Sequence, residues 1–546
     1  MLIVKKNIVL LTFISGLFFM KNYQSSFKAN NENLLSQLTQ KIYAYLSDKF
    51  PVACSSDEFW FFPQHVHDIS TLCKWDHFSN EAVMDCCQKL SRWDMDIKLI
   101  CDIRSPSNST ELDAYLVSNM VRTLQEHLEI FRPWERQPTF HLSIACIGLA
   151  QAFSYGRTDY LRNRALALSD FFKNATHSLK NVPALFMNLG LNMIKDTRLF
   201  FKDCLPKLPE LGHALNALDD FEQKMIQMPT IENFLLPTSS YAHLVDVHMQ
   251  THLDLKTISD MLTQEIHQST EMIINYSKGS HRSSDNKKLL AQKDFFKPEI
   301  NSEIKWFFNE VNNLKLHCKK YGLISDSIDI NCPVSIENVP DYLKTIRTAS
   351  SYSFSPLQKQ CKGTFFVLEN EAAKHMGNSF QLSTESPMLA AHETYPGHHL
   401  LDASRSILTN WIRRPLESPL FYEGWACFAE ILMLQTEFYK TKDADYLVSK
   451  RRLWRAIRGQ IDLNIHTGKM TFETAANNLN QIGIDNKRAF QIVRKYPLHP
   501  GYQLCYTIGL LNFLELKSCS EKPMAQWVQT ILSAGEIPFI FLKELL

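Results

Sequence analysis

The sequence has few glycines, almost no net charge, and none of the common motifs for nucleotide binding or serine hydrolysis. Only 17 glycines occur in 546 residues, which argues against a turn-rich all-β chain. The formal net charge is +1, so the composition predicts no surface for nucleic acid or for a polyanionic substrate. The chain contains no Walker loop, no GxSxG elbow and no CxxC pair, which argues against a nucleotide-dependent enzyme, a serine hydrolase and a cysteine-type structural zinc site.

The 13 cysteines are too sparse for a disulfide scaffold. Five of them crowd into the N-terminal region: Cys54, Cys73, Cys86, Cys87 and Cys101. Because the chain also begins like an exported protein, we expect one or two disulfides in this region. The odd total leaves at least one free thiol.

The first residues resemble an export signal. Lys5 and Lys6 precede an apolar run over residues 7–20, which is shorter than the about 20 residues of a membrane-spanning helix. We therefore expect residues 1–24 to be a signal peptide or a retained N-terminal membrane anchor. Either interpretation predicts a protein that is exported, to the periplasm or the medium.

Apolar residues recur at three- and four-residue spacing through most of the chain, which predicts a mostly α-helical fold. We expect residues 25–285 to form a helical N-terminal subdomain and residues 286–546 a second helical subdomain. The polar stretch 277–288 is the predicted boundary, and residues 51–110 are expected to be irregular with short helical pieces. The predicted helices are 30–50, 112–131, 140–153, 160–179, 183–201, 210–228, 253–276, 300–321, 450–464, 471–481, 487–495 and 502–516.

A short β-prone run, residues 363–368, precedes the most informative stretch of the chain. Such a strand could offer an open edge along which an extended peptide pairs its backbone. The alternative is a packed edge strand without a ligand.

Two Ser-Pro pairs, at Ser386 and Ser418, predict the starts of two helices, with serine as the cap and proline at the first helical position. The first helix carries His392 and Glu393. Zinc-binding helices usually space two histidines four residues apart and place a glutamate next to the first as general base. Here the fourth position is a proline, and the next histidines follow six and seven residues after the first. A bulge or kink at the Pro-Gly pair between them would make His398 the second ligand, with His399 as the alternative.

The second helix supplies the expected third ligand, Glu423. Glu430, two turns further on the same face, is predicted to accept a hydrogen bond from a ligating imidazole. These carboxylates stand in a largely apolar helix, and a buried carboxylate needs a partner. A solvated helix charge, or core histidines without a metal, is the alternative.

These residues resemble a large bacterial family catalogued as domain of unknown function 885. The similarity lies in the HExxPGHH stretch His392–His399, in Glu423-Gly424-Trp425-Ala426 with Glu430, and in segments 462–469 and 500–509. The resemblance implies a large helical body with a deep central cleft and kinship with helical zinc peptidases whose third ligand is a downstream glutamate. The widened spacer departs from those peptidases.

The predicted function is zinc-dependent hydrolysis of peptide substrates, with Glu393 as general base. Tyr506 is the candidate donor to the oxyanion, Tyr502 lies one turn earlier, and His466 and His499 are second choices. Two other functions remain open: hydrolysis of a non-peptide amide, and a catalytically silent helical metal-binding protein.

Overall fold

The computed structural model of the protein describes residues 30–154, 156–278, 290, 294–300, 302–325, 328, 331–340, 349–355, 362–368, 381–441 and 443–546. The predicted N-terminal segment 1–24 and most of the polar stretch 277–288 lie outside these residues. Within the described ranges, no helix combines the length and the apolar character needed to cross a membrane.

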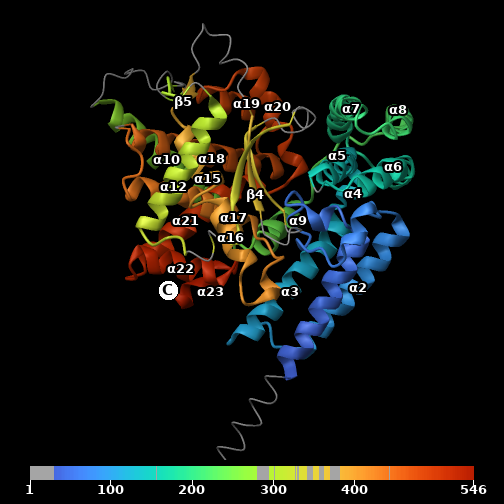
Figure 1. The fold of residues 1–546 in the computed structure, drawn as a ribbon, viewed down its shortest axis with the longest axis horizontal. Coiled ribbons are helices and arrows are strands. Elements are labelled where there is room, and N and C mark those ends of the chain that lie inside the picture. The colour runs from blue at the N-terminus through green and yellow to red at the C-terminus, as the bar shows by residue number, and fades with distance from the viewer. Residues whose placement is uncertain are drawn as a thin grey trace, which may run out of the picture.

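The fold is mostly α-helical, as predicted, and its first half is a series of helices joined by short connections (Figure 1). Residues 30–49 form the first helix. Those that follow are α2 (Asn80–Ile100), α3 (Ser109–Glu126), α4 (Pro133–Arg136), α5 (Pro138–Ser154), α6 (Thr158–Ser178), α7 (Ala184–Cys204), α8 (Leu211–Gln227), α9 (Thr238–His243) and α10 (Leu255–Lys278). Short 3-10 turns lie at Ala53–Ser55 and Ile69–Cys73, and π-helical turns at His127–Phe131 and Leu244–His248.

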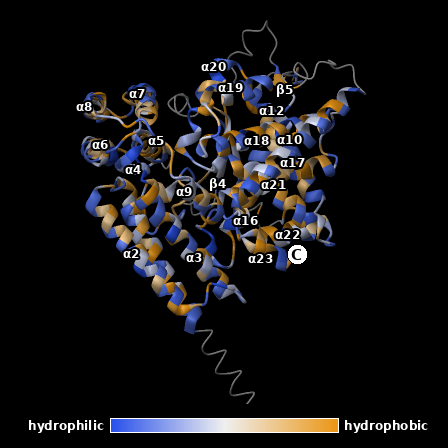
Figure 2. Ribbon diagram, turned by 180° about the vertical axis from the view of Figure 1, so that it is seen from behind, coloured by the Kyte–Doolittle hydropathy of each residue, from blue (hydrophilic) through white to orange (hydrophobic). Residues whose placement is uncertain are grey.

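Helix α2 corrects the expectation that residues 51–110 are irregular. The Ser79 side chain caps it by accepting a hydrogen bond from the backbone N–H of Ala82. Its buried face includes Cys86, Leu90 and Trp93, and Figure 2 shows hydrophilic and hydrophobic residues alternating along it. The five N-terminal cysteines are all free thiols, so the predicted disulfides are absent and these side chains pack mainly as small apolar residues.

The second half contains the helices that surround the predicted metal-binding residues. They are α12 (Glu303–Lys320), α15 (Ser386–Glu393), α16 (His398–Ser406), α17 (Pro419–Gln435), α18 (Ala444–His466), α19 (Phe472–Gln481), α20 (Asn486–Val493), α21 (Tyr502–Ser518), α22 (Met524–Ala534) and α23 (Phe539–Leu542). Short 3-10 turns lie at Trp411–Arg413, Tyr496–Leu498 and Lys543–Leu545. Helix α10 of the first half packs along α18, while α17, α18 and α21 pack on one another.

A small sheet stands beside these helices (Figure 1). Its order is β2 (Val334–Asn338), β4 (Lys362–Val367), β3 (Ser351–Ser355), with β4 parallel to β2 and antiparallel to β3. A second, two-stranded sheet pairs β1 (Phe295–Phe296) with β5 (Leu382–Ser383). The β-prone run is therefore a strand, but neither the open edge nor the packed edge strand expected for it is correct, because β4 pairs on both sides and is the central strand.

Two glycines bring helices α17 and α21 into direct backbone contact. A Cβ added at Gly424 would lie 2.5 Å from the backbone of Gly509, and one added at Gly509 would lie 2.1 Å from the carbonyl oxygen of Leu420. Neither position therefore tolerates a side chain without separation of the helices. This contact sets Glu423 of α17 close to the start of α21.

Candidate metal centre

The helix that carries His392 stops immediately after it, and a new helix begins at His398. The predicted bulge within one continuous helix is thus a complete break between α15 and α16. Gly397 fits this break because a Cβ there would lie 1.9 Å from the carbonyl oxygen of His392. The indole Nε1–H of Trp425 donates to the carbonyl oxygen of Pro396 at 2.8 Å and fixes the turn to α17.

The proline positions at both helix starts are as predicted, but the serine caps are not. Ser386 is the first residue of α15 rather than its cap, and Ser418 precedes α17 without a side-chain capping bond. The fixed φ of the two prolines suits the first helical turn.

His392, His398 and Glu423 converge on a common point, and their ligand atoms lie within 4.8 Å of one another. The Oε2 atom of Glu423 is 3.7 Å from Nε2 of His392 and 3.6 Å from Nε2 of His398. These separations exceed hydrogen-bond lengths. They are close to the about 3.4 Å between neighbouring ligands around a tetrahedral zinc ion.

His399 lies outside this group. Its Nε2 is 3.1 Å from the hydroxyl of Tyr395 and its Nδ1 is 3.2 Å from the hydroxyl of Tyr352. The structure thus brings the first of the two alternative histidines to the cluster and packs the second between two tyrosines.

One atom in the cluster supports the fit of a cation. Oε2 of Glu423 is buried and has no hydrogen-bond partner among the described residues. An uncompensated buried carboxylate oxygen is costly, and a cation between it and the two imidazoles would satisfy it. Two imidazoles and one carboxylate form a donor set well suited to zinc.

A buried ion network holds His392 in position. Its Nδ1 is 3.0 Å from Oε1 of Glu430, so an Nδ1–H can donate there and leave Nε2 directed at Glu423. Glu430 also receives hydrogen bonds from Arg451 at 2.7 and 3.0 Å and from Arg455 at 2.5 and 3.1 Å. The role expected of Glu430 thus agrees with its contacts. The two arginines, four residues apart on α18, were not anticipated, although their spacing places them on one helix face.

Charge interactions within this network oppose the effect of burial. Burial alone would raise the pKa of Glu430, but Arg451 and Arg455 hold that pKa well below its usual value. For His392, burial favours the neutral ring, whereas the nearby carboxylates of Glu423 and Glu430 raise the pKa above its ordinary value. Glu430 therefore remains a carboxylate and keeps its orienting hydrogen bond.

Glu393 lines a cavity of about 470 Å³ that also reaches His392, Arg458 and Tyr506. Its Oε2 accepts a hydrogen bond of 2.9 Å from the backbone N–H of Tyr352 in strand β3. A half-buried carboxylate thus lies next to His392 of the metal-type cluster, and both residues line the same cavity.

The tyrosines of α21 lie on the other side of Glu423. The Tyr502 hydroxyl donates to Oε1 of Glu423 at 2.7 Å, so that carboxylate presents its other oxygen to the histidines. Tyr506 lines the cavity, and the guanidinium of Arg458 lies 4.8 Å from the centre of its ring. Burial, assisted by Glu423, raises the pKa of Tyr506 well above its usual value and keeps its hydroxyl protonated.

His466 and His499 lie elsewhere. His466 stacks on Tyr241 with ring centres 4.8 Å apart, and both histidines line a different cavity that also reaches Tyr502. Burial lowers the pKa of His466 to about 4, so it is a neutral ring at ordinary pH. These positions do not favour the second-choice roles considered for them.

The fold and the cluster define a mostly helical protein with a buried His-His-Glu group able to hold a metal ion. A family model described as "Bacterial protein of unknown function (DUF885)" matches residues 207–546. The chain belongs to this family, as the sequence motifs predicted.

Two solved structures share the fold over nearly the whole chain. One is a "putative lipoprotein from Colwellia psychrerythraea", with a TM-score of 0.74, 13% identity, and coverage of 94% of this chain and 98% of the other. Another is a "putative lipoprotein of unknown function from Shewanella oneidensis", with a TM-score of 0.69, 14% identity, and coverage of 94% and 99%. No curated protein matches the sequence.

Proposed function

We propose that the protein is a zinc-dependent peptidase whose metal is held by His392, His398 and Glu423. The observation that carries this proposal is the convergence of two buried imidazoles and an unpartnered carboxylate oxygen, with His392 and the adjacent Glu393 both lining one cavity. When bound, zinc would lower the pKa of a water molecule toward about 7 and polarise a carbonyl group. A cluster of this composition beside a general base is what hydrolysis requires.

The protein's own residues then divide the remaining tasks. Glu393 is placed to accept the proton of the attacking water and return it to the leaving amine. The backbone N–H of Tyr352 holds one oxygen of Glu393 and thereby orients the other toward the cavity. Tyr506, kept protonated, is the donor available to the developing oxyanion.

The site's support extends beyond its ligands. Glu430 fixes the tautomer of His392, and the Tyr502 hydroxyl fixes the orientation of Glu423. Such positioning reduces the reorganisation needed when the substrate binds. The cavity of about 470 Å³ is large enough for a few residues of a peptide.

We also propose that the protein is exported. The apolar segment 7–20 after two lysines supports export, and the solved structures with this fold are described as lipoproteins. Fractionation of cells that express the full chain would test this proposal, and a purely cytoplasmic pool would contradict it.

The experiment for the activity is mass spectrometry of a mixed peptide pool digested by the purified protein, with and without chelator. We expect cleavage that chelation abolishes and zinc restores, and a loss of about a hundredfold or more in Glu393→Gln with zinc retained. Cleavage of simple amides but not of peptides would favour the non-peptide hydrolase. Zinc bound without any hydrolysis in either assay would favour the catalytically silent protein.

A further inference from the structure

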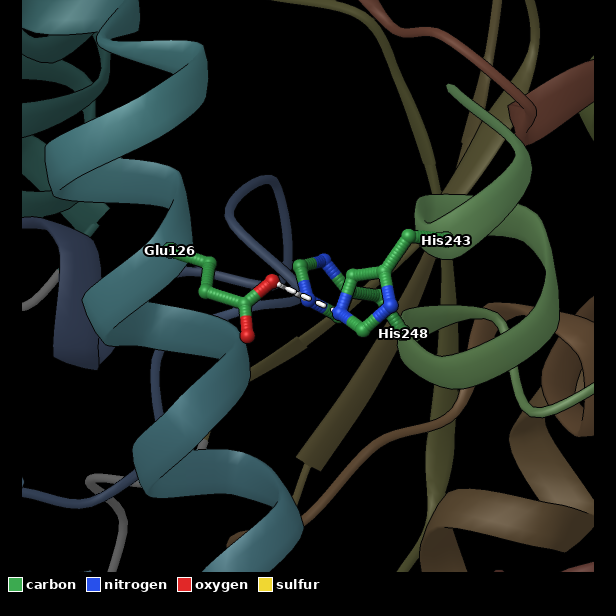
Figure 3. A group of neighbouring side chains, drawn as sticks. All are labelled: Glu126, His243 and His248. Carbon is green, nitrogen blue, oxygen red and sulfur yellow. Dashed lines mark hydrogen bonds and ion pairs between the residues drawn. The ribbon is translucent and has the colours of Figure 1, made fainter. Parts of the chain in front are cut away.

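A second group of two histidines and a glutamate lies on elements that the proposed catalytic site does not use. Glu126 ends helix α3, His243 ends α9, and His248 ends the π-helical turn that follows (Figure 3). Oε2 of Glu126 is 2.9 Å from Nε2 of His243 and 2.9 Å from Nε2 of His248. All three ligand atoms lie within 4.8 Å of one another.

The π-helical turn explains how two histidines five residues apart face the same carboxylate. On an α-helix, five residues rotate a side chain by about 140°, so the two rings would diverge. The wider turn Leu244–His248, closed by the hydrogen bond from the Met249 N–H to the Leu244 carbonyl, reduces this divergence. π-Helical turns of this kind occur frequently at functional sites.

Burial divides the group into an anchored part and an accessible part. The His248 side chain is fully buried, whereas 46% of the His243 side chain and 25% of the Glu126 side chain are exposed. The buried ring of His248 packs against His127, with ring centres 5.3 Å apart, and its Nε2 faces Glu126. A cation can therefore enter from solvent and meet one ligand already fixed in the core.

We propose that Glu126, His243 and His248 form a second site for a divalent transition metal, zinc being the ion best suited to this donor set. The present spacing of 2.9 Å between oxygen and each nitrogen is that of hydrogen bonds. Binding requires the partly exposed Glu126 side chain to move back by about half an ångström. Its oxygen would then be about 3.4 Å from each nitrogen, the separation of neighbouring ligand atoms around one zinc ion. The fourth position, on the exposed side, is open to water.

The site would be structural rather than hydrolytic. It joins α3 to the segment Leu244–Met249, whose apolar side chains pack against the start of α21: a Cβ at Gly501 would lie 2.8 Å from Cδ2 of Leu244. Metal binding there would clamp the N-terminal helices to the helix that carries Tyr502 and Tyr506. The prediction of a second bound ion does not depend on the proposed peptidase activity.

Zinc content per chain tests the proposal. Full-length protein is stripped with chelator, reloaded with zinc chloride, freed of excess zinc, and measured by elemental mass spectrometry. We expect His243→Asn and Glu126→Gln each to hold one zinc ion fewer than the wild type. His267→Asn is the matched control, because this exposed imidazole also lies beside a carboxylate, at 3.6 Å from Glu271, without a third ligand.

The counts separate failure of this site from failure of the proposed catalytic site. Two ions in the wild type and one in His243→Asn would support both sites. One ion in the wild type and none in His243→Asn would support the second site alone. Equal counts in wild type and His243→Asn would overturn the proposal, as would binding of the additional ion only at about 1 mM zinc. As a second measurement, zinc should raise the melting temperature of His398→Asn but not of the double variant that also carries His243→Asn.

Discussion

Replacing Glu430 by glutamine tests whether the buried network orients the metal-type cluster. The substitution keeps the shape of the side chain but removes the negative charge that faces Arg451, Arg455 and His392. An amide can accept only through its one oxygen, and its NH₂ group would face the arginine donors. Removal of one partner from a buried ion network typically costs about 3–5 kcal/mol of unfolding free energy.

The same substitution should weaken zinc binding. Loss of the partner that orients a ligating histidine typically lowers metal affinity by about 10–100-fold. Urea denaturation of the chelated protein measures the stability change, and competition with a chromophoric chelator measures the zinc affinity. Glu473→Gln is a suitable control because Glu473 is an exposed carboxylate in the first turn of α19.

The reasoning would be refuted by a Glu430→Gln protein with wild-type zinc affinity and wild-type stability. Loss of stability with unchanged zinc affinity would show that the network supports the fold but not the orientation of His392. The two measurements therefore separate the two roles given to this carboxylate.

Three further predictions concern the backbone, the catalytic cavity and pH. Gly397→Ala should cost about 3 kcal/mol or more in urea unfolding, because its Cβ would meet the backbone at 1.9 Å; a stable variant would contradict the geometry of the break. Tyr506→Phe should lower kcat of the proposed hydrolysis by about 10²–10³-fold with zinc content unchanged. A variant in which KM changes but kcat does not would refute the donor role. Burial lowers the pKa of His141 from 6.5 to about 4, so its contribution to stability is present above pH 6.5 and is lost as pH falls toward 4, by about 3 kcal/mol in total. In denaturant titrations, the wild type should lose this stability between pH 6.5 and 4 and His141→Gln should not, and profiles that stay parallel over this pH range would show that this histidine is not buried in its neutral form.

Most of the helices could be predicted because their periodicity is strong. The predicted boundaries of the helices after residue 110 agree with the structure within a few residues, except that α18 begins six residues earlier at Ala444. Helix α2 is not evident from the sequence because its apolar face is built partly from Cys86 and Cys87, and cysteines in an N-terminal cluster indicate disulfides as readily as a core face. Pairing of β4 on both sides was not predicted, because no strand was expected at Val334–Asn338 or Ser351–Ser355.

The candidate site was predictable where residues are close in sequence. The break at Pro396-Gly397 follows from local chemistry, and the choice between His398 and His399 became decidable only when their surroundings were known. Arg451, Arg455 and Tyr352 reach the site from α18 and β3, so no local motif announces them. The same holds for the group around Glu126, because more than a hundred residues separate this carboxylate from the two histidines.

The contact between α17 and α21 has a consequence for how the cavity can vary. Because Gly424 and Gly509 let the two backbones touch, the distance from the Glu423 carboxylate to the tyrosines of α21 is set by main-chain atoms rather than by adaptable side chains. A methyl group at either glycine would separate the two helices and move Glu423 away from the tyrosines of α21, although no polar residue would be altered. Residues that line the cavity, such as Leu389 and Trp454, can vary without moving this contact, whereas Gly424 and Gly509 permit almost no variation.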